Sequence, residues 1–197
     1  MKKLLCSVLI LVLAAITMLS FCACSDNDGY SENDDGEVFL YPADYDEDIF
    51  ENSAYTDKVT DVKYIESGYS VLLDSSNYDS ADEYGKLFYR FFDSIKHGDA
   101  QQYISYIASD YFNDKNPAPE KFTMQKLYDI EVSYVEDLEL EYNGENIKVK
   151  DFIVRYKIMY NNGTFRADLP SDAVIPQHFL VGETEGELKI LNIVDIN

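Results

Sequence analysis

The chain has 197 residues, in which 37 Asp and Glu stand against 16 Lys and Arg, giving a formal net charge of −21. Phosphate binding requires clustered basic side chains, so nucleic acid is excluded as an expected partner. All three cysteines precede Ser25, and His97 and His178 are the only histidines. Beyond Ser25 we therefore expect no disulfide, no thiolate nucleophile, no zinc site and no cofactor.

Residues 1–23 have the pattern of an export signal. Two lysines precede an uncharged apolar stretch from Leu4 to Leu19, and polarity changes abruptly at Ser25. An uncleaved membrane anchor is the alternative interpretation. Even counted on to Cys24, the segment barely reaches the roughly 20 apolar residues that a membrane span needs, and it contains the hydroxyl side chains of Ser7, Thr17 and Ser20, so we favour a cleaved signal.

The end of this signal, Leu-Ser-Phe-Cys-Ala-Cys, resembles the lipobox of bacterial lipoproteins. In that motif a small residue precedes a cysteine that is acylated and becomes the mature N-terminus. Cys24 follows the small Ala23 and is our first choice for lipidation. Cys22 follows the bulky Phe21 and is the second choice, although Leu19 suits it better. The resemblance implies an exported protein that lipid anchors to the outer face of the cell membrane.

Residues 24–57 are expected to form a lipidated N-terminus and a disordered acidic linker. Residues 25–57 hold 12 acids and no Lys or Arg, a composition that repels itself and favours extension. The carboxylates of Asp44–Asp48 match the start of a calcium loop. Ile49 replaces its turn glycine and Tyr55 its bidentate glutamate, so we expect no metal site. The charge leaves a basic protein or peptide as a candidate partner.

Two helices are predicted near the start of the domain proper. Ser80, with Glu83 three residues later, forms a capping box, and apolar residues follow at helical spacing. Gly98 is expected to end this helix, and Asp99 to cap the next one. The stretch 59–73 before them is ambiguous, and only its last four residues suit a strand.

From Ile130 onward the apolar pattern has the period of a strand. Asn143-Gly144 predicts a tight hairpin, and Asn161-Asn162-Gly163 predicts a second one. The apolar positions change parity between Val149 and Phe152, which predicts a β-bulge in that strand. The predicted strands span residues 130–142, 147–160, 164–167, 177–181 and 188–196.

This order resembles the nuclear transport factor 2-like superfamily, also called the cystatin-like cone fold. The resemblance rests on the helix 84–92 running into His97-Gly98-Asp99, and on the closing strand Gly186-Glu187-Leu188-Lys189-Ile190. It covers about residues 79–196 of a domain predicted over residues 58–197. It implies an α+β fold in which N-terminal helices pack on one face of a strongly bent antiparallel sheet. In such folds the mouth of the cone holds a ligand, a catalytic site or nothing.

Some members of this superfamily are isomerases or dehydratases that pair a carboxylate base with tyrosine donors in an apolar pocket. The residue types are present here, which gives Asp151, His178, Tyr84 and Tyr103 as pocket candidates. Each also has a structural interpretation. Asp151 can be a solvated bulge residue, His178 an ordinary strand histidine, and Tyr84 and Tyr103 tyrosines at the edge of the core. No catalytic motif of the superfamily matches position by position, so no catalytic residue is assigned.

Three functions remain open. The favoured one is a non-catalytic, membrane-tethered binding or scaffolding module, because the chain combines a lipid signal and an acidic spacer with no recognisable catalytic constellation. The second is a small-molecule enzyme or apolar-ligand carrier that uses the cone cavity. The third is an envelope regulator that presents the acidic linker to a basic partner.

Overall fold

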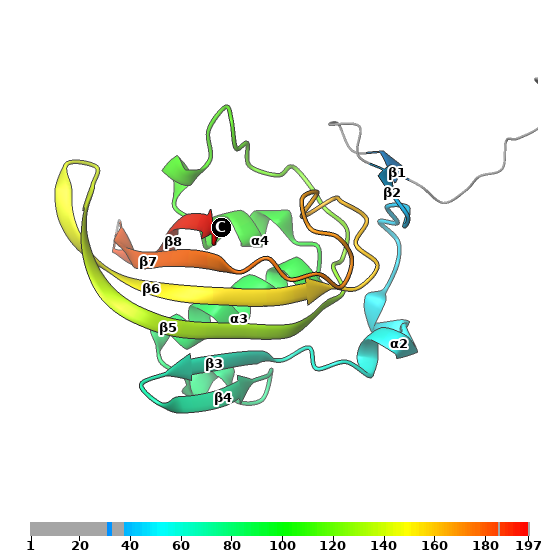
Figure 1. Cartoon of the computed structure of the whole chain (residues 1–197), viewed down its shortest axis with the longest axis horizontal. Coiled ribbons are helices and arrows are strands. Elements are labelled where there is room, and N and C mark those ends of the chain that lie inside the picture. The colour runs from blue at the N-terminus through cyan, green and yellow to red at the C-terminus, as the bar shows by residue number, and fades with distance from the viewer. Residues whose placement is uncertain (1–30, 33–37, 185, 197) are drawn as a thin grey trace, which may run out of the picture.

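The computed structural model describes residues 31–32, 38–184 and 186–196, so the predicted signal and both lipidation cysteines lie outside the described residues. A six-stranded sheet in the order β4-β3-β5-β6-β7-β8 forms its centre (Figure 1). No helix in these ranges is long and apolar enough to cross a membrane. The sheet strands are β3 (Val62–Glu66), β4 (Tyr69–Leu73), β5 (Leu127–Tyr142), β6 (Glu145–Ile158), β7 (Gln177–Thr184) and β8 (Glu187–Asp195). The other elements are β1 (Ser31–Glu32), β2 (Val38–Phe39), α2 (Ser53–Thr56), α3 (Glu83–Lys96), α4 (Ala100–Ser105) and the short 3₁₀ turns η1 (Ile49–Glu51), η2 (Tyr78–Ser80) and η3 (Ser109–Tyr111).

The predicted cone fold with N-terminal helices on an antiparallel sheet is wrong. The sheet is mixed, because β3 runs parallel to β5, and the hairpin β3-β4 precedes the two longer helices α3 and α4 in the chain. Ser67 and Gly68 form the hairpin turn with φ values of 51° and 84°, the left-handed geometry of a two-residue turn. The sequence left this stretch ambiguous because a parallel pairing between residues as distant along the chain as Val62 and Ile130 has no local signature.

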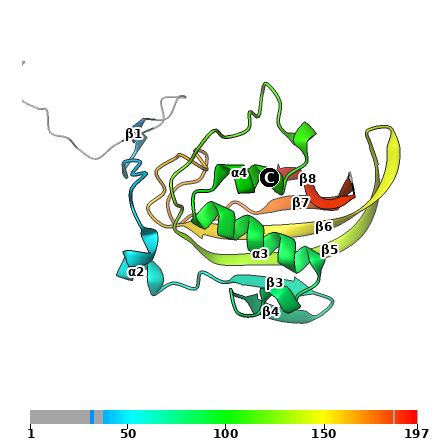
Figure 2. The ribbon, with the colours of Figure 1, turned by 180° about the vertical axis from the view of Figure 1, so that it is seen from behind.

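The two longer helices lie together on one face of the sheet, which Figure 2 shows from behind. The predicted stop at Gly98 and the cap at Asp99 are confirmed: Gly98 has a φ of +68°, and the Asp99 side chain accepts a hydrogen bond from the Gln102 N–H at 2.9 Å. The predicted cap at Ser80 is wrong. Asp82 caps α3, because its carboxylate accepts the Gly85 N–H at 2.7 Å.

Aromatic rings fill the space between α3 and the sheet. Phe88 of α3 is fully buried, with its ring centroid 4.9 Å from that of Phe152 on β6 and 6.1 Å from that of Phe179 on β7. Phe91 and Phe92, one helical turn further on, are also buried. This apolar layer is the main contribution to folding that the described residues offer, since burial of aromatic area dominates core energetics.

The bulge predicted in the strand at 147–160 lies instead in its neighbour. The register of β5 against β6 shifts twice, between Tyr128 and Glu131 and between Tyr134 and Glu136, and the extra residue lies in β5 both times; Val135 is the extra residue of the second shift. Side chains alternate along the uninterrupted β6, so Phe152 faces α3, whereas Val149 faces the other way and joins a small second cluster with Ala108 and Leu191. The apolar residues of β6 change from odd to even positions because the strand contributes to two hydrophobic clusters, one on each face of the sheet.

The second predicted hairpin is also wrong, because residues 161–176 form a compact loop rather than a turn and a strand. The buried Asn161 organises this loop. Its amide nitrogen donates to the carbonyls of Arg166, at 2.8 Å, and Leu169, and its backbone N–H donates to the Ser171 hydroxyl at 2.8 Å. These side-chain bonds replace the ladder bonds that a hairpin would have made.

Part of the acidic segment before Lys58 packs on the sheet. Ile49 and Tyr55 are fully buried in a cluster with Tyr128 and Met159. The Tyr55 hydroxyl donates to the Leu127 carbonyl at 2.9 Å. The packed unit in the described residues thus begins before the domain start placed at Lys58 by composition, since a few apolar side chains outweigh the acidic surroundings.

We expect Ile49→Ala to lower the free energy of unfolding by about 2–3 kcal/mol, because it removes a buried side chain from a small cluster that has little capacity to collapse. Urea unfolding followed by far-UV circular dichroism measures this. Leu40→Ala is the matched control, since Leu40 is 64% exposed in the same segment. Equal stability of the two variants would show that the segment is not packed in solution.

Candidate functional site

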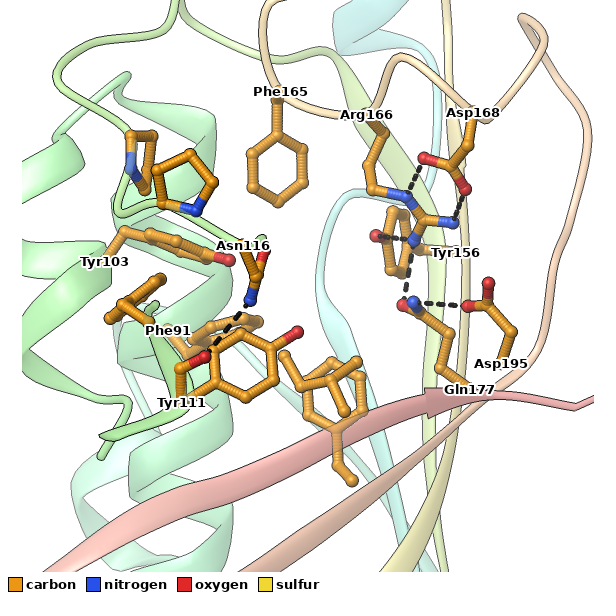
Figure 3. A pocket seen from close by; sticks show the side chains of 15 residues that line it. Phe91, Tyr103, Tyr111, Asn116, Tyr156, Phe165, Arg166, Asp168, Gln177 and Asp195 are labelled. Atoms are coloured by element: carbon orange, nitrogen blue, oxygen red, sulfur yellow. Dashed lines mark hydrogen bonds and ion pairs between the residues drawn. The ribbon is translucent and has the colours of Figure 1, made fainter. Parts of the chain in front are cut away.

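The candidate site is a pocket of about 380 Å³ between the helix side of the sheet and the loops at one of its ends (Figure 3). This volume is in the range of pockets that bind small organic molecules. Rings make up much of the wall, and a band of polar side chains faces them. The lining residues are Phe91, Tyr103, Tyr111, Phe112, Asn116, Pro117, Pro119, Tyr156, Phe165, Arg166, Asp168, Gln177, Phe179, Ile193 and Asp195.

One wall of the pocket is aromatic. Tyr103 on α4 lies at its centre, with ring centroids 5.3 Å from Phe91 and 5.5 Å from Phe165. The ring of Phe165 stands perpendicular to that of Tyr103, which is a favourable edge-to-face geometry. Figure 3 shows the hydroxyls of Tyr103 and Tyr111 pointing into the open space, toward the polar wall.

The opposite wall is held together by Arg166. Its guanidinium donates through Nε to Asp168 at 2.6 Å and through one terminal nitrogen to the other Asp168 oxygen. The second terminal nitrogen donates to the Tyr156 hydroxyl at 2.7 Å and to the Gln177 side-chain oxygen at 2.8 Å. The Gln177 amide then donates to Asp195 at 2.8 Å. This chain of bonds ties the loop 161–176 to β6, β7 and β8 and fixes the wall before any ligand arrives.

The ionisation of the wall follows from these contacts. Burial would lower the pKa of Arg166, but the hydrogen bonds that it donates to Asp168 and the negative charge of that carboxylate hold the pKa above its usual range. The same bonds hold the pKa of Asp168 below its usual range. Burial raises the pKa of Tyr103, Tyr111 and Tyr156. At neutral pH the three phenols therefore stay protonated beside a charged ion pair.

Gly163 allows the ring of Phe39, from the segment before the sheet, to pack against the loop that carries Arg166. Gly163 has a φ of +76°, and a β-carbon there would lie 2.4 Å from the ring of Phe39. The ring of Phe39 therefore packs directly on the backbone of the loop. Any larger residue at this position would displace it and loosen the pocket wall from outside.

Of the four pocket candidates from the sequence, only Tyr103 lines the pocket. Asp151 and His178 contact each other, with His178 Nδ1 2.9 Å and 2.8 Å from the two Asp151 oxygens. They lie on the sheet face opposite the helices, since Asp151 alternates with the core residue Phe152 along β6. The structure thus pairs two residues that the sequence proposed separately, yet places them away from the pocket.

Tyr84, the fourth candidate, belongs to a different cluster near the start of α3. Its ring lies under the Lys150 ammonium, 4.5 Å from nitrogen to centroid. Lys150 also forms an ion pair with Glu66 at 2.5 Å. Glu66 accepts the Tyr64 hydroxyl at 2.7 Å, and Asp82 lies 3.3 Å from the same hydroxyl. Glu66 and Asp82 therefore share the Tyr64 hydroxyl, and Glu66 alone pairs with Lys150.

The two carboxylates of this cluster have opposite pKa shifts. Burial and the facing Glu66 raise the pKa of Asp82, against the opposing Gly85 N–H. Burial would raise the pKa of Glu66 too, but Lys150 and Tyr64 hold it below its usual range. Asp82 is thus the member that takes up a proton first as the pH falls.

We expect Asp82→Asn to stabilise the protein at neutral pH by at most about 1 kcal/mol, because Asn caps helices as well as Asp does and removes the repulsion from Glu66. The pKa of Asp82 is raised in the folded protein, so the protonated carboxyl favours folding. The wild type therefore loses this stability as the pH rises through the folded pKa and Asp82 becomes charged. The difference between variant and wild type should therefore vanish in acid. Urea unfolding at several pH values tests this, with Asp99→Asn, the same change at the α4 cap, as control. A gain from Asp82→Asn that persists in acid contradicts the assignment.

Sequence reasoning missed the polar wall. The chain has three arginines, and Arg166 is the one outside a regular element, since Arg90 lies in α3 and Arg155 in β6. The sequence did contain one indication of this wall: an arginine stands two residues before an aspartate, in a stretch rich in turn residues, and such a pair can form a bidentate ion pair. It was overlooked because residues 164–167 were predicted to be a strand.

No three Asp, Glu or His side chains within the described ranges are grouped so that they could hold a metal ion. The acidic run at 44–48 contacts other parts of the protein instead. Asp48 accepts the Phe50 N–H at 2.9 Å, and Glu47 pairs with the buried Lys126 at 2.6 Å.

In comparisons with known proteins, no family model, curated protein or solved structure matches this chain.

Proposed function

We propose that this protein is a non-catalytic binding module, exported and anchored by lipid, whose domain holds a small organic ligand in the pocket between α4 and the loop 161–176. The pocket itself is the observation that carries the proposal. Its aromatic wall offers ring faces for stacking, and its polar wall is fixed in advance by the bonds of Arg166. Preformed walls of this kind reduce the ordering cost of binding.

The state of Asp168 and of the pocket phenols favours binding over proton transfer by these groups. Arg166 occupies both oxygens of Asp168, and burial keeps the phenols of Tyr103 and Tyr156 protonated. A general base needs a free lone pair and a pKa near the working pH. The contacts of this wall suit recognition of shape and polarity.

The proposed location rests on the first residues of the sequence. Lipid on Cys24 would place the domain at the membrane surface, joined by the acidic segment that follows. Metabolic labelling with a fatty acid tests the anchor in wild type, Cys24→Ala and Cys22→Ala. Label should be lost in Cys24→Ala and kept in Cys22→Ala, and label that survives Cys24→Ala excludes Cys24 as the modified residue.

Ligand binding is tested by thermal unfolding of the purified protein with a panel of small amines, sugars, carboxylates and aromatic alcohols. Any compound that fits the pocket should raise the Tm of the wild type by mass action. Asn116→Trp is expected to abolish the shift, because Asn116 lines the pocket on an exposed turn and the larger ring fills the space.

Lys115→Trp is the matched control, since Lys115 is the neighbouring residue on that exposed turn and is not among the lining residues. Its Tm shift should equal that of the wild type. The proposed function is contradicted if no compound raises the Tm of the wild type, or if the shifts of Asn116→Trp and Lys115→Trp are the same.

A further inference from the structure

The charges that line the pocket do not cancel. Arg166 is the one basic residue among the lining side chains, and Asp168 and Asp195 are the acidic ones. Asp168 holds the guanidinium with both oxygens and neutralises it locally. Asp195 is left as a net negative charge, in a chain whose formal net charge is −21. An anionic ligand would meet repulsion in this pocket.

The hydrogen-bond donors of the polar wall are largely used within the protein. Arg166 donates to Asp168, Tyr156 and Gln177, as described above. The amide of Gln177 donates to one oxygen of Asp195, and that of Asn116 donates to the Tyr111 carbonyl at 3.4 Å. Few nitrogen donors of this wall are therefore left for a ligand, and the phenol hydroxyls that face the pocket accept as well as donate.

Acceptors, in contrast, are left over. The second oxygen of Asp195 makes no hydrogen bond to the described residues, and neither does the hydroxyl of Tyr103, which points into the pocket (Figure 3). Burial raises the pKa of Tyr103, so its oxygen stays a neutral phenol that accepts as well as donates. The site thus presents acceptors to a ligand that brings N–H groups of its own.

The aromatic wall adds a second attraction for positive charge. Ring faces carry negative charge density and attract ammonium groups that lie within about 6 Å of the ring centroid. The protein already uses such contacts, since the Arg166 guanidinium lies 5.9 Å from the Tyr156 ring centroid. Tyr103, Phe165 and Tyr111 offer further rings on the other side of the space.

Resting on the proposed function, we propose that the ligand of this pocket is an organic cation: an ammonium group bonded near Asp195, attached to an apolar or aromatic body that packs against Tyr103 and Phe165. A free amine and the lysine side chain of a basic peptide share this chemistry. Asp195 sets the preference for charge, and the rings bind the body of the ligand.

Three phenols of one shape and different charge test the proposal: tyramine, a cation; tyrosol, its neutral alcohol; and 4-hydroxyphenylacetate, an anion. Calorimetric titration into the purified protein should give tyramine an affinity about tenfold higher than that of tyrosol, the size expected for one charge-assisted contact. No binding of the anion is expected. A peptide with a single lysine and its norleucine counterpart form the second arm, which distinguishes a peptide from a free amine.

Asp195→Asn should remove the preference, so that tyramine and tyrosol bind alike, while the oxygen that accepts from Gln177 is retained. Asp79→Asn makes the same change in net charge at an exposed position at the start of η2 and should leave the tenfold preference intact. Tyrosol or 4-hydroxyphenylacetate binding as tightly as tyramine would overturn the cation assignment. The cation assignment would also be overturned by a panel in which neutral compounds bind and neither the amine nor the lysine peptide does. The proposed function would still stand in that case, because the pocket would still bind a small molecule.

Discussion

Arg166→Met is expected to lower the free energy of unfolding by about 3 kcal/mol. Its pairing with the half-exposed Asp168 contributes little, because water rehydrates that carboxylate. Most of the cost comes from the Tyr156 hydroxyl and the Gln177 side-chain oxygen, which are buried and lose their donor. Urea unfolding followed by far-UV circular dichroism measures the change.

Arg155→Met is the matched control for this arginine. Arg155 is 41% exposed on its side-chain surface and lies 3.6 Å from Glu131, so its removal should cost less than about 1 kcal/mol. Arg166→Lys keeps the charge but loses the planar fork that reaches three residues, and should fall between the two. If Arg166→Met and Arg155→Met destabilise equally, Arg166 does not organise the pocket wall.

Phe88→Ala is expected to cost about 3–5 kcal/mol, the largest effect predicted for a single substitution here. The side chain is fully buried between α3 and the sheet, where its ring contacts Phe152 and Phe179. Phe179 also lines the pocket, so loss of Phe88 should loosen the floor of the site and weaken ligand binding along with stability.

Tyr69→Ala is the control for the aromatic deletion. Tyr69 is 81% exposed on β4, and its removal should change the free energy of unfolding by no more than about 0.5 kcal/mol. The same urea experiment compares the two variants. A cost for Phe88→Ala below about 1.5 kcal/mol would mean that α3 is not packed on the sheet as described.

Local elements of this fold could be predicted from the sequence, since their causes are local. The break at Gly98, the cap at Asp99 and the hairpin turn at Asn143-Gly144 each depend on the conformational preference of one or two residues, and all three are confirmed. The strands at 177–181 and 188–196 were found because their apolar residues alternate within a few positions.

The errors concern interactions between distant parts of the chain. The pairing of β3 with β5 joins Val62 to Ile130, and no property of either segment alone specifies it. The bulge was placed in the wrong strand because an apolar pattern shows a change of face but not which partner carries the extra residue. The loop 161–176 was taken for a hairpin because Asn-Gly is a strong turn signal, whereas the side chain of Asn161 binds the loop carbonyls instead.

The pocket is the least predictable part, since its lining comes from two helices, three strands and two loops. Tyr103 was found because tyrosines on the helix face were considered, yet Arg166, Gln177 and Asp195 became a single wall only through the sheet order. Asp151 and His178 were predicted as separate residues, and the register of β6 with β7 brought them together on the opposite face.

A crystal structure of the protein with tyramine at saturating concentration would show whether this pocket binds an organic cation. We expect the ammonium nitrogen within hydrogen-bond distance of Asp195 and the ring between Tyr103 and Phe165. A tyramine molecule bound elsewhere on the surface, with the pocket free of it, would contradict the claim.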